Sequence, residues 1–173
     1  ALGDPVDILQ KGMQKIPQSS NLHNAFAYAI YQINPPKALE HWQIVTGLTP
    51  HHIGAFAGMA KYYFSNGDFE NLVLVAEKIR AISTKTPVLK EMAHFCAMAK
   101  KYEPAIDILN DYITENPIDV LALSKLSLYY AENGQFDAAL VGLKQVLASK
   151  PQEESIILNL RRIQALMQRE QVA

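Results

Sequence analysis

The chain has 173 residues, of which 49% are hydrophobic and 19% are charged, so it can bury a core and is not a disordered tail. Its 16 basic and 17 acidic side chains give a net charge of −1, which disfavours nucleic acid as a partner. The longest purely aliphatic run, Leu72 to Ala76, is far shorter than the roughly 18 residues of a membrane span. We therefore expect a soluble chain with no direct membrane insertion. The compartment, cytoplasmic or periplasmic, is left open.

Residues 5–17 are the first predicted element, a single helix that ends at Pro17. Pro17 lies 33 residues before Pro50, and nearly the same interval recurs further along the chain. The segment therefore resembles the second helix of an incomplete helix pair. We expect the chain to be a fragment that starts inside a longer array.

Four longer units follow, and their matching positions recur at a nearly constant interval. A small or aliphatic residue lies near the start of the second helix in each unit, and successive residues of this kind are 34, 33 and 34 residues apart. Three prolines each lie twelve residues after such a marker, where they end the second helix of a unit. The markers are Ala38, Leu72, Ala105 and Ala139, and the prolines are Pro50, Pro117 and Pro151. The units are expected to span residues 19–52, 53–85, 86–119 and 120–153.

The fourth unit has the clearest internal pattern. Its first helix carries large and small residues at fixed places, its turn contains Gly134, and its second helix carries Ala139 and Leu143. The first-helix positions are Leu123, Leu126, Ser127 and Tyr130. This arrangement resembles the tetratricopeptide repeat (TPR), a helix–turn–helix unit of 34 residues. The resemblance covers most of the chain.

Two units depart from this pattern. The third has Lys100 where the turn glycine is usual. The first has Phe26 where the repeat normally has a tiny residue and Ala29 where it prefers tyrosine, so we infer that bulk was exchanged between neighbouring positions at constant volume. The turn of the first unit is assigned to the residues from Asn34 to Pro36.

Residues 154–170 carry aliphatic side chains at helical spacing, with Arg161 and Arg162 elsewhere on the helix, and we expect a capping helix. Two short helices cannot bury their apolar faces alone, so the units must stack. The predicted fold is all-α, a single right-handed α-solenoid of antiparallel helix pairs over residues 1–173, with about ten helices.

No pattern in the sequence indicates catalysis. The five histidines show no H-E-x-x-H spacing, and the sequence has no glycine-rich phosphate loop or nucleophile elbow. Cys96 and Trp42 occupy core positions of their units. We therefore expect no enzyme activity, no catalytic residue, no cofactor and no metal site.

The resemblance implies that the first helix of each unit lines a concave groove, with its second, fifth, ninth and twelfth positions facing a ligand. Ile30, Phe64, Leu121 and Leu128 would be apolar anchors, and Lys61 with Lys90 would form a mild positive centre. The alternative, that these positions are solvated surface, stays open. The candidate partner-binding residues are His23, Ala27, Ile30, Ala57, Lys61, Phe64, Lys90, His94, Leu121, Ser124 and Leu128.

A clamp that TPR chaperone adaptors use for acidic C-terminal tails is not present, because its lysine, arginine and asparagine positions hold other residues. These are His23, Ala27, Gly58, Pro87 and Glu91. The expected function is a protein-interaction scaffold that binds a peptide or helix of a partner protein, within a bacterial assembly or envelope-biogenesis machine. The alternatives are a homo-oligomeric scaffold that pairs through residues 5–16, and an accessory interaction domain of a longer protein.

Overall fold

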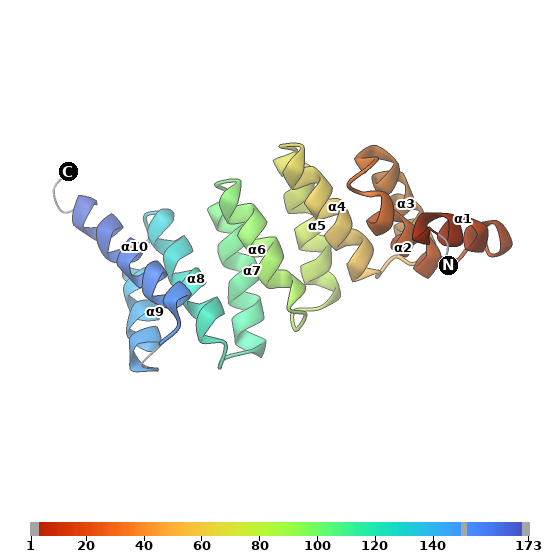
Figure 1. The fold of residues 1–173 in the computed structure, drawn as a ribbon. Coiled ribbons are helices and arrows are strands. Elements are labelled where there is room, and N and C mark those ends of the chain that lie inside the picture. Colours follow the sequence, from red (N-terminus) through yellow and green to blue (C-terminus); the bar gives the residue numbers. More distant parts are fainter. Residues whose placement is uncertain (1–3, 150–151, 171–173) are drawn as a thin grey trace. The chain divides into compact units, whose positions relative to one another are not determined.

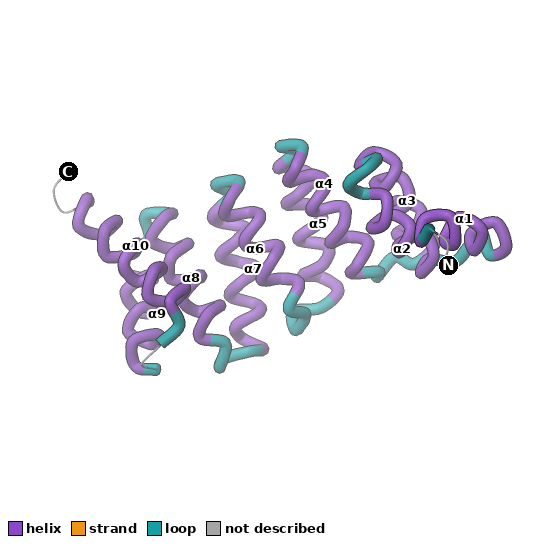
Figure 2. Tube along the Cα trace, viewed as in Figure 1, coloured by secondary structure: helices purple, strands orange, loops and turns teal. Residues whose placement is uncertain are grey.

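The computed structural model describes residues 4–149 and 152–170, without the side chain of Glu170. These ranges contain ten helices and no strand, joined by short loops (Figures 1 and 2). The all-α prediction with about ten helices is thus confirmed, whereas Pro151 lies outside the described residues. The helices are α1 (Pro5–Lys15), α2 (Ser20–Ile30), α3 (Pro35–Leu48), α4 (Ile53–Ser65), α5 (Phe69–Ile82), α6 (Val88–Met98), α7 (Tyr102–Glu115), α8 (Val120–Glu132), α9 (Phe136–Ala148) and α10 (Glu154–Glu170).

The chain divides into two compact units, Ala1–Ile82 (unit 1) and Ser83–Ala173 (unit 2). In unit 1, α2 packs against α3 and α4 packs against α5. In unit 2, α6 packs against α7 and α8 against α9. Each unit is therefore built from two helix pairs and one further helix, α1 or α10. A single array over residues 1–173 with a right-handed course stays a prediction.

Side chains placed just before the helices explain where several of them begin. Ser19, Asn34 and Asp119 accept a hydrogen bond from a backbone N–H in the first turn of α2, α3 and α8, which satisfies a donor that has no partner inside the helix. Proline at the first helical position suits α3, because its fixed φ is already helical. Pro35 and Pro36 therefore start α3, and the preceding turn ends at Asn34.

The three turns inside the later helix pairs share one geometry. Gly67 and Gly134 have φ of 71° and 75°, and Lys100 has φ of 59°. After Lys100, the N–H of Lys101 donates to the Cys96 carbonyl at 2.8 Å, as the equivalent bonds do in the other two turns. Lys100 thus adopts the left-handed conformation that glycine adopts more cheaply.

Close approach between helices is made possible by small residues facing large ones. In unit 1, a Cβ added at Gly58 would overlap the fully buried ring of Trp42. In unit 2, a Cβ added at Gly142 would overlap the buried hydroxyl of Ser127. These glycines are therefore fixed by packing rather than by backbone conformation.

In the first helix pair, the residues that occupy the repeat positions differ from those predicted from the sequence. The buried residues of α2 are His23, Phe26, Ala27 and Ile30, one position later than expected. Ala27 and Ala38 are 11 residues apart, whereas Ala60 and Leu72 are 12 apart, so the connection in this pair is one residue shorter. Ala27 fills the tiny position and Phe26 a large one, and the inferred exchange of bulk at Phe26 is wrong.

Candidate partner-binding faces

The shorter connection moves three predicted groove residues into the interior of unit 1. His23, Ala27 and Ile30 are buried, and Ala27 has no exposed surface at all, so a partner cannot touch it in this fold. The Nε2–H of His23 donates to the Pro17 carbonyl at 2.8 Å. Its other nitrogen therefore accepts from Nδ1 of His41, also at 2.8 Å. His23 is thus a packed, hydrogen-bonded residue of the first helix pair.

The following residues of α2 take the groove positions instead. Asn21 and Tyr28 are exposed, the latter by 45%, and Asn24 is half-buried. The Tyr28 hydroxyl donates to the Gly54 carbonyl at 2.7 Å, which joins α2 to α4. These residues were not predicted from the sequence, although the 11-residue spacing between Ala27 and Ala38 was the signal that could have placed them.

A second tyrosine strengthens this connection. The Tyr31 hydroxyl lies 3.3 Å from the Lys61 carbonyl and 3.2 Å from the Ser65 hydroxyl. The Lys61 ammonium lies 5.4 Å from the centre of the Tyr31 ring, a cation–π distance. Because α2 and α4 are tied at several points, their facing side chains form one surface, the α2–α4 face, defined by Asn21, Asn24, Tyr28, Ala57, Lys61 and Phe64.

The α2–α4 face is aromatic and amide-rich with very little charge. Lys61 is exposed, and it is the one charged side chain in the two helices. Ala57 and Phe64, both predicted groove residues, are half-buried. Phe64 lies beside Phe69, with ring centres 6.4 Å apart. The surface therefore offers aromatic contact area and polar groups around one positive charge.

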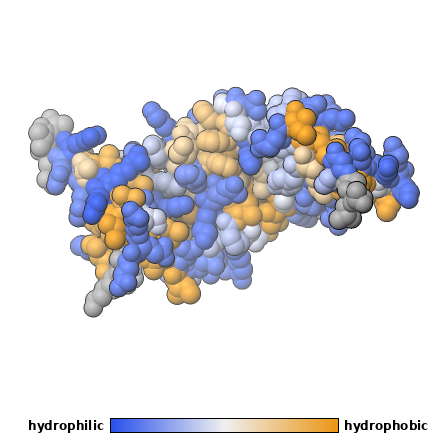
Figure 3. All heavy atoms as spheres, viewed as in Figure 1, coloured by the Kyte–Doolittle hydropathy of each residue, from blue (hydrophilic) through white to orange (hydrophobic). Residues whose placement is uncertain are grey.

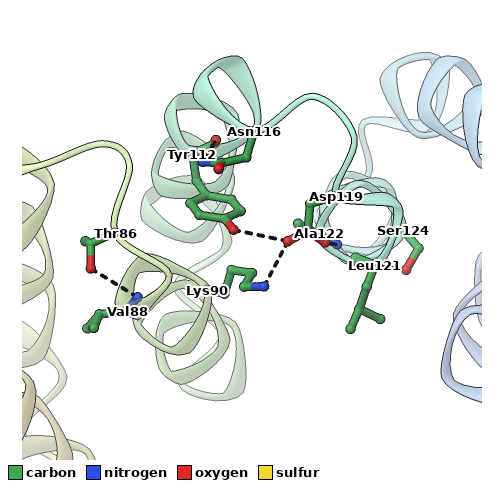
Figure 4. A network of polar contacts seen from close by, with 9 residues as sticks. All are labelled: Thr86, Val88, Lys90, Tyr112, Asn116, Asp119, Leu121, Ala122 and Ser124. Atoms are coloured by element: carbon green, nitrogen blue, oxygen red, sulfur yellow. Dashed lines mark hydrogen bonds and ion pairs between the residues drawn. The ribbon is translucent and has the colours of Figure 1, made fainter.

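In unit 2, Lys90 differs from its predicted role. Its ammonium donates to Oδ2 of Asp119 at 2.8 Å, and the Tyr112 hydroxyl donates to the same oxygen at 3.1 Å (Figure 4). The other carboxylate oxygen, Oδ1, caps α8 by accepting from the N–H of Ala122. The hydrogen bond to Asp119 raises the pKa of Lys90. Because Asp119 balances its charge, Lys90 is a bridge between α6 and α8 and does not supply a free positive centre.

Asp119 shows the complementary effect. Burial alone would raise the pKa of its carboxyl group, but the hydrogen bonds from Lys90 and from the Ala122 N–H lower it below the ordinary value. The carboxylate is therefore the charged centre of a network that joins three helices.

A cavity of about 220 Å³ lies between α6, α8 and α10 in unit 2. His94 and Leu128, both predicted groove residues, line it. Burial lowers the pKa of His94, and the nearby Lys125 lowers it further. Burial raises the pKa of Tyr129, another lining residue, to about 12. The cavity is therefore lined by mixed groups, with a neutral imidazole and a neutral phenol near pH 7.

The helix α10 covers the predicted groove positions of α8. Ser124 has no exposed surface and Leu128 is 8% exposed, whereas Leu121 is half-buried. The Ser124 hydroxyl donates to the Leu121 carbonyl at 2.9 Å and accepts from Nδ2 of Asn159, on α10, at 3.1 Å. Ser124 and Leu128 are thus groove residues that already have a neighbour from the same chain.

The described residues show neither a metal centre nor a membrane span. No cluster of three or more His, Cys, Asp or Glu in them could hold an ion, and none of their helices is both long and apolar enough to cross a bilayer. Cys96 is fully buried, as its core position predicted. On the face drawn in Figure 3, hydrophilic side chains interrupt the hydrophobic patches in both units.

Comparison with known proteins bears on the fold. No family model matches the sequence, and no curated protein matches it. Among solved structures, MamA is 16% identical with a TM-score of 0.68, over 84% of this chain and 86% of MamA. YrrB, described as a TPR protein with an unusual peptide-binding site, is 15% identical with a TM-score of 0.65, over 93% of each chain.

A thermophilic TPR protein from Thermus thermophilus is 15% identical with a TM-score of 0.58, over 94% of this chain and 88% of that protein. Several of the similar structures are thus TPR proteins, and their likeness agrees with the helix pairs, the turn geometry and the small residues described above. The chain has the tetratricopeptide-repeat fold.

Proposed function

We propose that this chain is a protein-interaction scaffold that binds a segment of a partner protein on the α2–α4 face. The observation that carries the proposal is the composition of this face, where the exposed Tyr28 and Lys61 and the half-buried Phe64 occur with two asparagine amides on helices joined by hydrogen bonds. Aromatic side chains bring large contact area at low entropic cost and are common among residues that dominate binding. Because hydrogen bonds join α2 to α4, these side chains are held in place before a partner arrives.

The amide of Asn24 gives the face a further capacity. Its Oδ1 is buried and has no hydrogen-bond partner among the described residues, and such an acceptor costs about 1–3 kcal/mol. Because the Asn24 side chain is half-buried and not fully enclosed, we propose that it turns outward and accepts a hydrogen bond from a backbone N–H of the bound segment. This supports a peptide as the ligand, in line with the description of YrrB as having a peptide-binding site.

The charge of the face indicates the chemistry of the peptide. Lys61 is exposed and no carboxylate lies on α2 or α4, so an acidic or carboxylate group beside an aromatic or aliphatic side chain fits best. We place the scaffold within a larger multi-protein assembly, such as an envelope-biogenesis machine, as part of the same proposal.

The test is a selection of random displayed peptides on the full chain, followed by affinity measurements by fluorescence anisotropy. We expect the recovered peptides to bind the Lys61→Glu and Asn24→Ala variants at least about tenfold more weakly than the original chain. Lys144→Glu is the matched control, because Lys144 is exposed on α9 and makes the same charge change. Equal affinity for all four proteins would remove the α2–α4 face from consideration.

A second candidate function, self-assembly, is favoured by α1. This helix has no buried residue. Ile8 within it and Ile16 directly after it are 52% and 59% exposed, so these apolar side chains are available to a second copy. Light scattering over a range of concentrations should then show an oligomer that Ile8→Glu disrupts. A strict monomer at all concentrations would contradict self-assembly and leave the peptide-binding proposal unaffected.

A further inference from the structure

The last helix packs differently from the other helices that follow a helix pair. Within unit 1, α4 follows the pair α2–α3 and contacts α3 more than α2. Within unit 2, α8 follows the pair α6–α7 and contacts mainly α7. In both cases the helix that follows a pair lies on the second member of that pair. The helix α10 instead contacts mainly α8, the first member of its pair, and touches α9 far less. Its place is therefore the groove side of α8 and not the position of the next repeat.

The contacts of α10 follow the groove positions of α8. Asn159 donates to Ser124 at 3.1 Å, and Arg162 forms an ion pair with Glu132, further along α8. Beside these polar contacts, Ile156, Leu160 and Ile163 of α10 are buried. They occur at the i, i+4 and i+7 spacing of one helical face.

Two observations indicate that α10 is an incomplete fit to this groove. The cavity of about 220 Å³ between α6, α8 and α10 is open to solvent and borders Asn159 and Arg162. The side chain of Arg162 is 63% exposed although its partner Glu132 is only 15% exposed, so the ion pair lies at the rim, where solvent screens it. A helix with larger side chains towards the cavity would fill the same groove better.

We propose that α10 is an intramolecular occupant of a helix-binding groove, and that the partner this groove fits is an amphipathic helix with the same surface pattern. The partner would carry aliphatic side chains spaced like Ile156, Leu160 and Ile163, an amide at the place of Asn159 and a cation at the place of Arg162. It competes with α10 for the face of α8.

This inference extends the proposed function to unit 2. It is tested on α8 and α10, which contribute nothing to the α2–α4 face, so either proposal can fail while the other stands.

The test uses a labelled synthetic peptide of residues 152–170 and a second peptide with Arg162→Glu, each added to the full chain. In the Glu132→Arg chain, Arg162 of the native α10 faces another positive charge, which weakens the packing of α10 on α8. The groove of this variant should then prefer a helix with an acidic residue opposite position 132. We expect the Glu132→Arg chain to bind the Arg162→Glu peptide at least about tenfold more tightly than it binds the unchanged peptide. The matched control is Glu103→Arg, at an exposed site on α7, which should show no such preference.

Hydrogen exchange on the unaltered chain gives a readout that does not depend on how the variant folds. With excess unchanged peptide, we expect the amides of α10 to exchange faster while those of α8 stay protected. Unchanged exchange in α10, or a folded Glu132→Arg chain that prefers neither peptide, would make α10 a fixed part of the fold and overturn the proposal. If the Glu132→Arg chain forms dimers that persist in excess peptide, the groove holds a second copy of the chain, and the proposal is also overturned.

Discussion

The faces of α4 and α8 occupy matching places in two helix pairs, yet one is open and the other covered. On α4, Lys61 is exposed and Phe64 is half-buried. The positions that correspond on α8, Leu128 and Ala131, are 8% and 2% exposed. The same repeat scaffold thus presents an available surface in unit 1 and a surface with a resident helix in unit 2.

The two units also hold their helix pairs together by different means. In unit 1, the Trp42 ring lies against Gly58, and tyrosines bridge α2 and α4. In unit 2, the Asp119 network joins α6, α7 and α8, while α10 packs on α8. Unit 1 thus uses aromatic packing and hydrogen bonds between neutral groups, whereas unit 2 depends partly on a charged network, so a change of pH should affect the stability of unit 2 more.

The largest effect is expected in unit 1 from Trp42→Ala. Removing a fully buried ring leaves a cavity, and the loss in free energy of unfolding should be about 3–5 kcal/mol. Gly58→Ala probes the same contact from the other side and should cost about 1–3 kcal/mol through overpacking. Urea unfolding followed by far-UV circular dichroism measures both, with Gly47→Ala as control, since a Cβ there meets nothing. A cost below about 1 kcal/mol for Trp42→Ala would contradict the packing described for unit 1.

The next largest effect concerns the packing of α10 on α8. Ile163 is a fully buried residue of α10, and Ile163→Ala should cost about 2–3 kcal/mol and speed hydrogen exchange in α10 and along α8. The fluorescence of Trp42, which is the one tryptophan of the chain, should report an unchanged unit 1. Leu158→Ala is the control, because Leu158 is 54% exposed on the same helix. If both variants behave alike, α10 does not pack through the face assigned to it.

A smaller, pH-dependent effect is expected from Asp119→Asn. The variant should lose about 1–2 kcal/mol at neutral pH, because the charge-assisted hydrogen bonds from Lys90 and Tyr112 weaken. The pKa of Asp119 is lowered in the fold, so its stabilising contribution is present above the unfolded pKa and is lost as the pH falls through the folded pKa.

The difference in unfolding free energy between the original chain and Asp119→Asn should therefore shrink in acid, as measured by urea unfolding at several pH values. Asp107→Asn, at an exposed position of α7, should show no comparable difference at any pH. A difference for Asp119→Asn that is independent of pH would mean that the carboxylate charge is not what stabilises the network.

The smallest effect should be a gain in stability. Lys100 has φ of 59°, a conformation that costs a non-glycine residue about 1 kcal/mol. Lys100→Gly should raise the free energy of unfolding by about 0.5–1 kcal/mol, whereas Gly67→Ala and Gly134→Ala should lower it by a similar amount. Chemical denaturation of the three variants compares them directly. A loss of stability in Lys100→Gly would show that the lysine side chain makes a contact worth more than the relief of strain.

Much of the fold could be predicted from the sequence because single small residues recur at the same places in successive repeats. Ala105 and Ala139 mark second helices, and Gly67 and Gly134 mark turns, so the number and pairing of the helices follow from spacing. The first pair was misaligned by one residue because its two prolines and lack of a turn glycine hid the shorter connection. Burial of Ala27 reveals it.

The site was less predictable for a different physical reason. A stripe such as Ile156, Leu160 and Ile163 indicates that one face of a helix is buried, but not which neighbouring helix buries it. In the same way, spacing places Lys90 on the groove side but cannot show that Asp119, 29 residues later, takes its charge. Contacts between distant residues decide whether a repeat position is free for a partner.

The position of Asp119 also has a mechanical consequence for unit 2. The carboxylate fastens α6, α7 and the start of α8 at one end of the pairs, whereas the cavity extends to Met98, at the last turn of α6, and to Glu132, at the last turn of α8. The Asn110 side chain of α7 also donates to the Tyr130 hydroxyl of α8 at 2.8 Å, two residues before Glu132. Widening the cavity by moving the end of α8 away from α7 would therefore break this neutral hydrogen bond, while the charged network at Asp119 could stay intact.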